Sequence, residues 1–113
     1  MTNRELLEMA AKAAGITIRW ERECGVIRAR QQSGGYCGIW NPLADDGDAL
    51  RLVVALRISI DFASPHSKPI DRIQASARSN GNMSCIEKFR SDELVATRRV
   101  ITRAAAEIGK AMP

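Results

Sequence analysis

Three helical patterns, separated by two blocks of short alternating segments, constrain the fold of this chain more than any other feature. Apolar residues recur at helical spacing over about residues 3–14, over about 46–57 and from Ser91 or Asp92 onward. The segments between them alternate apolar and polar residues, which is the period of a half-buried strand. Helices this few do not suit a doubly wound sheet, in which a helix follows each strand. The sequence therefore predicts one two-layer α+β domain over residues 1–113, in the order α-β-β-β-α-β-β-β-α, with helices on one face of a mainly antiparallel sheet.

The helical patterns begin at residues that can cap a helix. Thr2 and Glu5 match the capping box S/T-x-x-E, in which each side chain accepts a hydrogen bond from the other's backbone. Gly15 is typical of the position just after a helix. Ser91 or Asp92 is the expected cap of the last helix.

Two of these helices carry recognisable faces. The second helix has the apolar residues Leu50, Val53, Val54 and Leu56. At 100° per residue, the last helix has one apolar stripe, formed by Leu94, Thr97, Ile101, Ala104, Ala105 and Ile108. Arg99, Arg103 and Lys110 fall opposite this stripe, and this face fits a plain solvated side as well as it fits a basic surface.

Turn signals divide the alternating blocks into strands. Turns are expected near residues 23–25 and at 33–35, and Asn80-Gly81 is typical of a type I′ hairpin. The segment 63–70 contains two prolines and is expected to be a loop. These signals predict antiparallel pairing of neighbouring segments.

Composition limits the class of protein. No apolar run approaches the roughly 20 residues that span a bilayer, and the N-terminal segment has acidic residues inside its apolar pattern, unlike a signal peptide. Cys24, Cys37 and Cys85 form no CxxC pair, so a disulfide framework is not expected. These features predict a cytoplasmic protein without a membrane partner.

An acidic segment, Asp45-Asp46-Gly47-Asp48, is the first candidate for chemistry. The EF-hand calcium loop requires a glutamate at its twelfth position, and counting from Asp46 that position is Arg57. A cap explains the acids better: Asp45 is the N-cap, Asp46 lies in the first turn, and Asp48 can reach back to the cap residue. We therefore predict a helix start and no metal site.

Other catalytic arrangements lack support. His66 is the single histidine and lies in a loop, and no G-x-S-x-G elbow accompanies it. The three cysteines and His66 have no zinc-knuckle spacing. The glycines of the segment "SGGYCG" are not followed by a helix or by a P-loop lysine. The sequence predicts no enzyme, no metal and no cofactor.

Arginine dominates a mildly basic chain whose formal net charge is +4. A possible basic surface on the open face of the sheet consists of Arg19, Arg28, Arg30, Arg72 and Arg78. Such a surface suits phosphate groups or an acidic protein. Most aromatic residues fall at the apolar positions of the alternating segments, so they are expected in the core and not on a surface where nucleic-acid bases could stack; single-stranded nucleic-acid binding is therefore disfavoured. No helix-turn-helix is apparent, which disfavours readout of duplex DNA.

Three stretches carry a resemblance to a known group. "MTNRELLEMAAKAAG", "WNPLADDGDALRLVVALRISID" and "ATRRVITRAAAEIGKAMP" resemble small phage and prophage proteins, and the layout is similar to that of the NinX-like phage family of unknown function. The resemblance covers most of the chain and is weakest between residues 64 and 90. It implies a phage accessory protein in the cytoplasm of a bacterial host, and it carries over no catalytic residue.

Three hypotheses follow. The first is a non-enzymatic phage accessory protein that binds a host protein or protein complex and inhibits a bacterial defence system, with the basic sheet face or loop 63–70 as its contact surface. The alternative is a nucleic-acid or nucleotide-binding module that uses the same arginines. The third is an enzyme that uses a metal held by Asp45, Asp46 or Asp48.

Overall fold

The computed structural model describes residues 2–21, 26–30, 36–62, 74–79, 83–88 and 92–113. Its elements, in chain order, are α1 (Asn3–Ala14), β1 (Ile18–Glu21), β2 (Val26–Arg30), β3 (Tyr36–Ile39), α2 (Asp46–Leu56), β4 (Ile58–Phe62), β5 (Gln74–Ser79), β6 (Met83–Lys88) and α3 (Glu93–Ala111). The predicted α+β class is confirmed. The predicted turns at 23–25, 33–35 and 80–81 and the loop 63–70 lie outside the described residues.

The strands form two sheets, and the prediction of one sheet is wrong. β1, β2 and β3 make one three-stranded sheet, here called sheet A, and β4, β5 and β6 make another, sheet B. Every strand pair is antiparallel. Short connections favour pairing between consecutive strands, and α2 separates the two groups along the chain. Each block of alternating segments therefore forms its own sheet.

Side-chain caps fix the beginnings of all three helices. The Thr2 hydroxyl accepts from the Glu5 backbone N–H at 3.2 Å, as the capping box requires. The Asp45 carboxylate accepts from the Asp48 N–H at 2.8 Å. Asp92, and not Ser91, caps α3, since its carboxylate accepts from the backbone N–H groups of Leu94 and Val95, at 2.9 and 3.2 Å.

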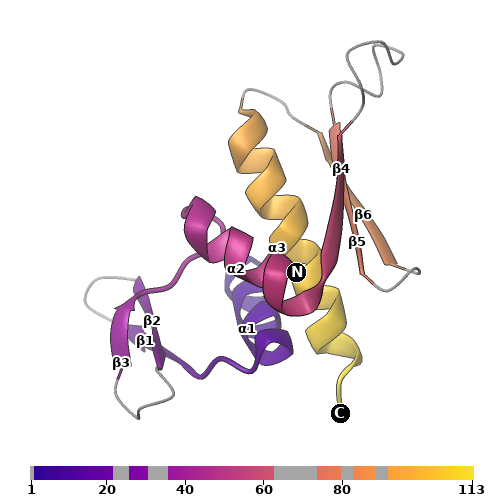
Figure 1. Ribbon diagram of the computed structural model, residues 1–113. Coiled ribbons are helices and arrows are strands. Elements are labelled where there is room, and N and C mark those ends of the chain that lie inside the picture. The colour runs from indigo at the N-terminus through magenta and orange to yellow at the C-terminus, as the bar shows by residue number, and fades with distance from the viewer. Residues whose placement is uncertain (1, 22–25, 31–35, 63–73, 80–82, 89–91) are drawn as a thin grey trace.

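Helix α3 is the centre of the molecule (Figure 1). One side of α3 packs on sheet B, mainly on β5 and β6, and its other sides contact α1 and α2. Helix α1 makes its main contact with α3 instead of with the sheet. The helices are therefore stacked outward from sheet B, and only α3 covers it broadly. Sheet A projects from the helical side, away from sheet B (Figure 1).

This central position changes the buried surface of α3 from the predicted single stripe. Val100, Ile101 and Thr102 are consecutive in the helix, yet all three are buried. Leu94, which the stripe included, is 59% exposed in the first turn. A helix that contacts other elements on several sides buries residues around most of its circumference. The buried Thr102 hydroxyl is satisfied because it donates to the Arg98 carbonyl at 2.8 Å.

The second helix is also less buried than its apolar sequence suggests. Ala49 and Leu52 are in the core, whereas Leu50 and Val54, four residues apart, are 61% and 59% exposed. Helix α2 ends at Leu56. Its C-cap residue, Arg57, has a left-handed backbone (φ 54°) that turns the chain directly into β4.

Helices α1 and α3 approach each other at a glycine. A Cβ atom at Gly109 would lie 2.8 Å from the carbonyl carbon of Met9 and closer still to its oxygen. Alanines complete the contact: Ala10, Ala11, Ala105 and Ala106 are all buried. Small residues on both helices thus let the two backbones come together.

We predict that Gly109→Ala destabilises the protein by roughly 2–3 kcal/mol, because the added methyl group would collide with backbone atoms of α1 that cannot turn aside. The measurement is urea unfolding followed by circular dichroism. Gly47→Ala is the matched control, since its Cβ would meet only the Asp45 and Arg51 side chains, at 3.2 and 3.4 Å. We expect the control to be neutral or to stabilise by up to about 1 kcal/mol, as alanine favours the helix. Equal effects of the two variants would contradict the close contact.

Candidate functional site

The acidic segment before α2 is a structural joint. Asp45 caps α2, while Asp48 accepts from the Asn41 backbone N–H at 2.9 Å and from Arg51 at 2.9 Å. The sequence predicted instead that Asp48 would reach back to the cap residue. The Asp45 N–H is already occupied, because it donates to the Asn41 carbonyl at 2.8 Å. Ala44 and Leu43 likewise donate to Asn41, so Asp48 satisfies the N–H of Asn41 itself.

Asp46 joins the same segment to α3. Its carboxylate accepts from the Arg98 guanidinium at 2.6 Å, and Arg98 also donates to the Leu43 carbonyl at 3.0 Å. Each of the three aspartates thus has its own partner in the fold. No group of three His, Cys, Asp or Glu side chains is placed to hold a metal ion within the described part of the chain. This arrangement supports the capping interpretation of the segment.

The predicted basic surface is divided between the two sheets. Arg19 on β1 lies opposite Arg28 in the register of sheet A, and Arg30 belongs to the same sheet. Arg78 is on β5 of sheet B and forms an ion pair with Asp61 at 3.7 Å. Arg72 lies outside the described residues. The described arginines therefore do not share one sheet face. The prediction placed them together because the sequence does not show that the strands form two sheets.

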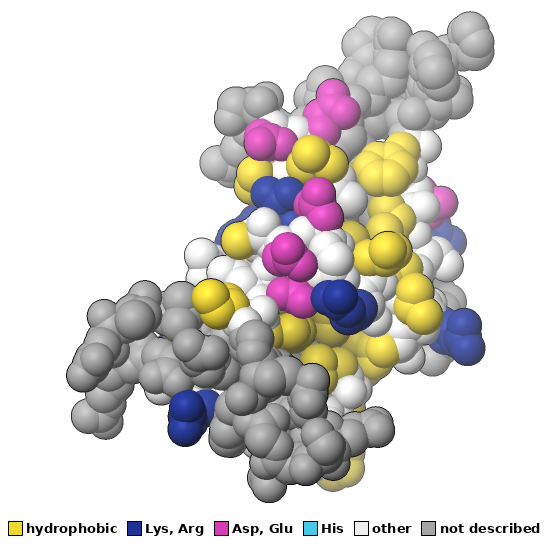
Figure 2. Space-filling model, turned by 60° about the vertical axis from the view of Figure 1, so that its left-hand side comes forward, with side chains coloured by type: hydrophobic (Ala, Val, Ile, Leu, Met, Phe, Trp, Pro, Cys, Tyr) yellow, Lys and Arg dark blue, Asp and Glu magenta, His cyan; other side chains and the backbone are white. Residues whose placement is uncertain are grey.

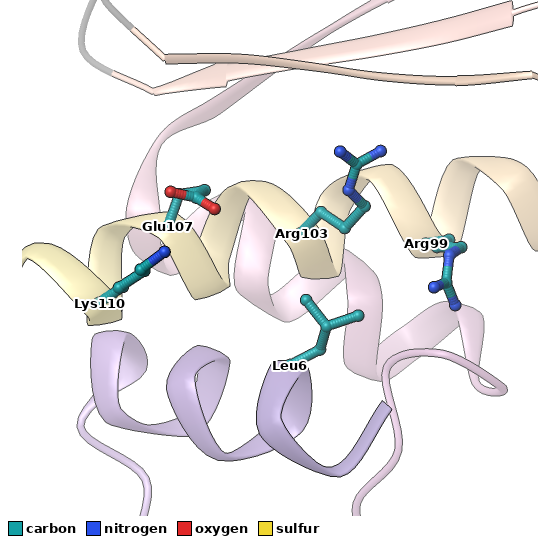
Figure 3. Close-up of a pocket in the computed structure, with 5 residues that line it drawn as sticks. All are labelled: Leu6, Arg99, Arg103, Glu107 and Lys110. Carbon is teal, nitrogen blue, oxygen red and sulfur yellow. The ribbon is translucent and has the colours of Figure 1, made fainter. Parts of the chain in front are cut away.

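A groove with three cations lies between α3 and α1 (Figure 3). It has a volume of about 360 Å³ and is lined by Leu6, Arg99, Arg103, Glu107 and Lys110. All the polar lining residues come from α3, and Leu6 points toward them from α1 (Figure 3). We call this feature the α1–α3 groove.

Glu87 of β6 orients the two arginines of the groove. Its carboxylate lies 2.6 Å from Arg103 and 3.6 Å from Arg99, and its side chain is only 18% exposed. Arg103 also donates to the Ile86 carbonyl at 2.9 Å, and Arg99 donates to the Asn3 side chain at 3.0 Å. These two arginines therefore contact neighbouring elements as well as solvent. Their guanidinium groups are held in place before any ligand arrives.

The groove is suited to binding an anion. Arginine and lysine donors recognise carboxylate or phosphate groups, and preoriented donors lose little freedom on binding. Glu107 adds one negative charge to the wall, so the groove is basic without being uniformly so. Leu6 supplies an apolar surface against which a side chain can pack.

The nearest thiol has no activated character. Cys85 is a free and buried cysteine on β6. Burial raises the pKa of its thiol, Arg103 lowers it in part, and Glu107 and Glu87 raise it further. A thiol with a raised pKa is protonated at neutral pH and is a weak nucleophile. Cys85 is therefore not an activated nucleophile.

Sequence reasoning found the cations of the groove but not the groove. The i,i+4 spacing of Arg99 and Arg103 was visible, as was the presence of Lys110 on the same face. The missing information was tertiary: α1 and β6 lie on either side of that face. The one local signal was Gly109, a glycine inside a helix among alanines, which indicates a close neighbour.

No protein-family model, no curated protein and no solved structure matches this chain. The resemblance to phage proteins therefore stays a prediction. Within the described ranges, no helix combines the length and the apolar character that crossing a membrane requires.

We predict that Asp48→Ala costs about 1–3 kcal/mol of stability, because it leaves the partly buried Asn41 N–H without an acceptor. Asp46→Ala should cost no more than about 1 kcal/mol, since the Asp46 side chain, which pairs with Arg98, is 66% exposed. Asp48→Asn is the control, because the amide keeps an acceptor oxygen and should retain most of the stability. Urea unfolding of the three variants tests this order, and an Asp46→Ala that costs more than Asp48→Ala would contradict it.

Proposed function

We propose that this protein is a non-enzymatic binding module that recognises an acidic segment of another protein through the α1–α3 groove. The observation that carries the proposal is the placement of Arg99 and Arg103, held by Glu87 at 3.6 and 2.6 Å beside an apolar side chain. A carboxylate entering the groove would meet donors that are already oriented. Arginine forks are the common means of recognising carboxylates in protein interfaces.

The charges of the groove favour an acidic protein over a nucleic acid. A phosphate backbone is uniformly negative, and Glu107 on the wall and Glu87 behind the arginines would repel parts of it. A protein segment can place a carboxylate near the arginines and a polar or basic group near Glu107. The net charge of +4 would attract such an acidic partner from a distance.

A second candidate function is nucleic-acid binding by sheet A. The observation that favours it is the register of β1 and β2, which sets Arg19 opposite Arg28. Phosphate binding by such residues would weaken steeply as salt increases, because counterions are released on binding. Titration of labelled single-stranded and double-stranded DNA and RNA over a salt series tests this alternative. Absence of binding at low salt would remove it.

The biological setting of the proposal rests on the resemblance to phage proteins. It makes the partner a protein or protein complex of the bacterial host and the purpose the inhibition of a defence system. The groove supports this setting only in that it offers an acidic partner a place to bind. The resemblance to phage proteins also makes bacterial lysate the source in which to search for the partner.

We predict that the double variant Arg99→Gln with Lys110→Gln binds its partner at least about tenfold more weakly, because it removes two of the three cations of the groove. The measurements are fluorescence anisotropy with labelled peptides rich in glutamate and aspartate, and capture of host proteins from bacterial lysate.

The matched control is Arg78→Gln with Lys88→Gln, which removes the same net charge from exposed positions of sheet B. The control should keep peptide affinity and the captured proteins. Equal losses in both variants would reduce the effect to general charge, and an unchanged groove variant would refute the proposal. Urea unfolding of both variants would establish that each is folded, since Arg99 contacts Asn3 and Glu87.

A further inference from the structure

Strand β4 is an edge of sheet B that has few of the features that prevent edge pairing. It hydrogen-bonds with β5 on one side, and no other described strand pairs with it. Its five residues, Ile58–Phe62, contain no proline and no lysine, and its register with β5 is continuous, without a bulge. Edge strands of this kind readily pair with another strand.

The opposite edge of sheet B is better protected. The Ile86 backbone carbonyl of β6 already accepts a hydrogen bond from Arg103. The exposed Lys88 also lies on β6, and an edge lysine opposes strand pairing. The edge available for pairing is therefore that of β4.

Apolar side chains on and beside β4 are more than half exposed to solvent. Helix α3 packs mainly across β5 and β6, and Phe62 of β4 is 56% exposed. Leu50 and Val54 of α2, the helix that leads into β4, are also more than half exposed. Figure 2 shows apolar side chains gathered in a column on one face, beside acidic and basic groups. A partner at the β4 edge would extend the sheet and bring apolar groups next to this surface.

The sequence of β4 is complementary to itself. In an antiparallel pair centred on Ile60, Ile58 lies opposite Phe62 of the second copy, and Ser59 lies opposite Asp61. Apolar residues then meet apolar residues on one face, and no two like charges are opposed. A shift by one residue would place the apolar side of one strand level with the polar side of the other. A shift centred on Asp61 would oppose two carboxylates.

We propose that two copies of this protein associate through antiparallel pairing of their β4 strands, centred on Ile60, to form a continuous six-stranded sheet from two copies of sheet B. The dimer has two-fold symmetry, so each side-chain pair across the interface occurs twice. The α1–α3 groove is lined by residues of α3 and α1, and Glu87, which holds its arginines, lies on β6, so both copies keep the groove outside the β4 contact.

A negative charge introduced at Ser59 tests this register. Sedimentation equilibrium over a concentration series should show a monomer–dimer equilibrium for the unchanged protein. Ser59→Asp would set a carboxylate opposite Asp61 of the second copy and should weaken dimerisation on the order of tenfold, since the two-fold symmetry makes this repulsion occur twice. The folded monomer would tolerate this change, because Ser59 lies beside Arg78 in the register of β4 and β5.

Two further variants give the experiment its controls. Adding Asp61→Ser to Ser59→Asp exchanges the two residues, leaves one carboxylate in each cross-strand pair and should restore dimerisation. The groove variant Arg99→Gln with Lys110→Gln should dimerise normally, so failure of the binding proposal and failure of the dimer proposal can be told apart.

The proposal would be overturned by a protein that stays monomeric at millimolar concentration, or by a dimer that does not respond to charge at residue 59. A monomer would leave the β4 edge for a strand of a different protein. A dimer insensitive to Ser59 would place the contact on another surface.

Discussion

The contact between the backbones of α1 and α3 is the constraint on which the rest of the structure depends. Gly109 lets the carbonyl group of Met9 come closer than any other residue would allow. This approach leaves α3 covered on one side by α1 and on another by sheet B, so the core forms around a single helix. This contact requires small side chains. The buried faces are rich in alanine, which lets the backbones lie close together, and dispersion contacts over a large area take the place of contacts made by larger core side chains.

The same packing decides what the charged residues do. Arg98 and Arg103 leave α3 in different directions, and each finds a carboxylate on a neighbouring element, Asp46 before α2 and Glu87 on β6. Both ion pairs are at 2.6 Å, the Glu87 pair partly buried and the Asp46 pair exposed at its carboxylate, so they fix orientation more than they add stability. Arg103 is therefore both a fastener of β6 and a wall of the groove. A binding site built from residues that also hold the fold together is rigid by construction, which suits recognition of a small charged group.

Sequence reasoning succeeded where the cause is local. The caps at Thr2, Asp45 and Asp92 depend on residues at most three apart, and the helices begin where these caps predict. It failed where the cause is distant. Whether six alternating segments form one sheet or two depends on which edges meet, and alternation along a strand carries no such information. The basic surface assigned to one sheet was divided for this reason.

Asp48 shows how a local pattern can be right in kind and incomplete in detail. Aspartates in a first turn do favour a helix start, and a cap by Asp45 was foreseeable from the sequence. The cap residue, however, already donates its N–H to the carbonyl of Asn41, so Asp48 has no donor to satisfy there and turns to the Asn41 N–H instead. With Asp46 directed to Arg98, three acids serve three separate connections. An acidic cluster in a sequence is therefore evidence of a metal site only when its carboxylates lack such partners, because each carboxylate that accepts hydrogen bonds from the fold is less available to a cation.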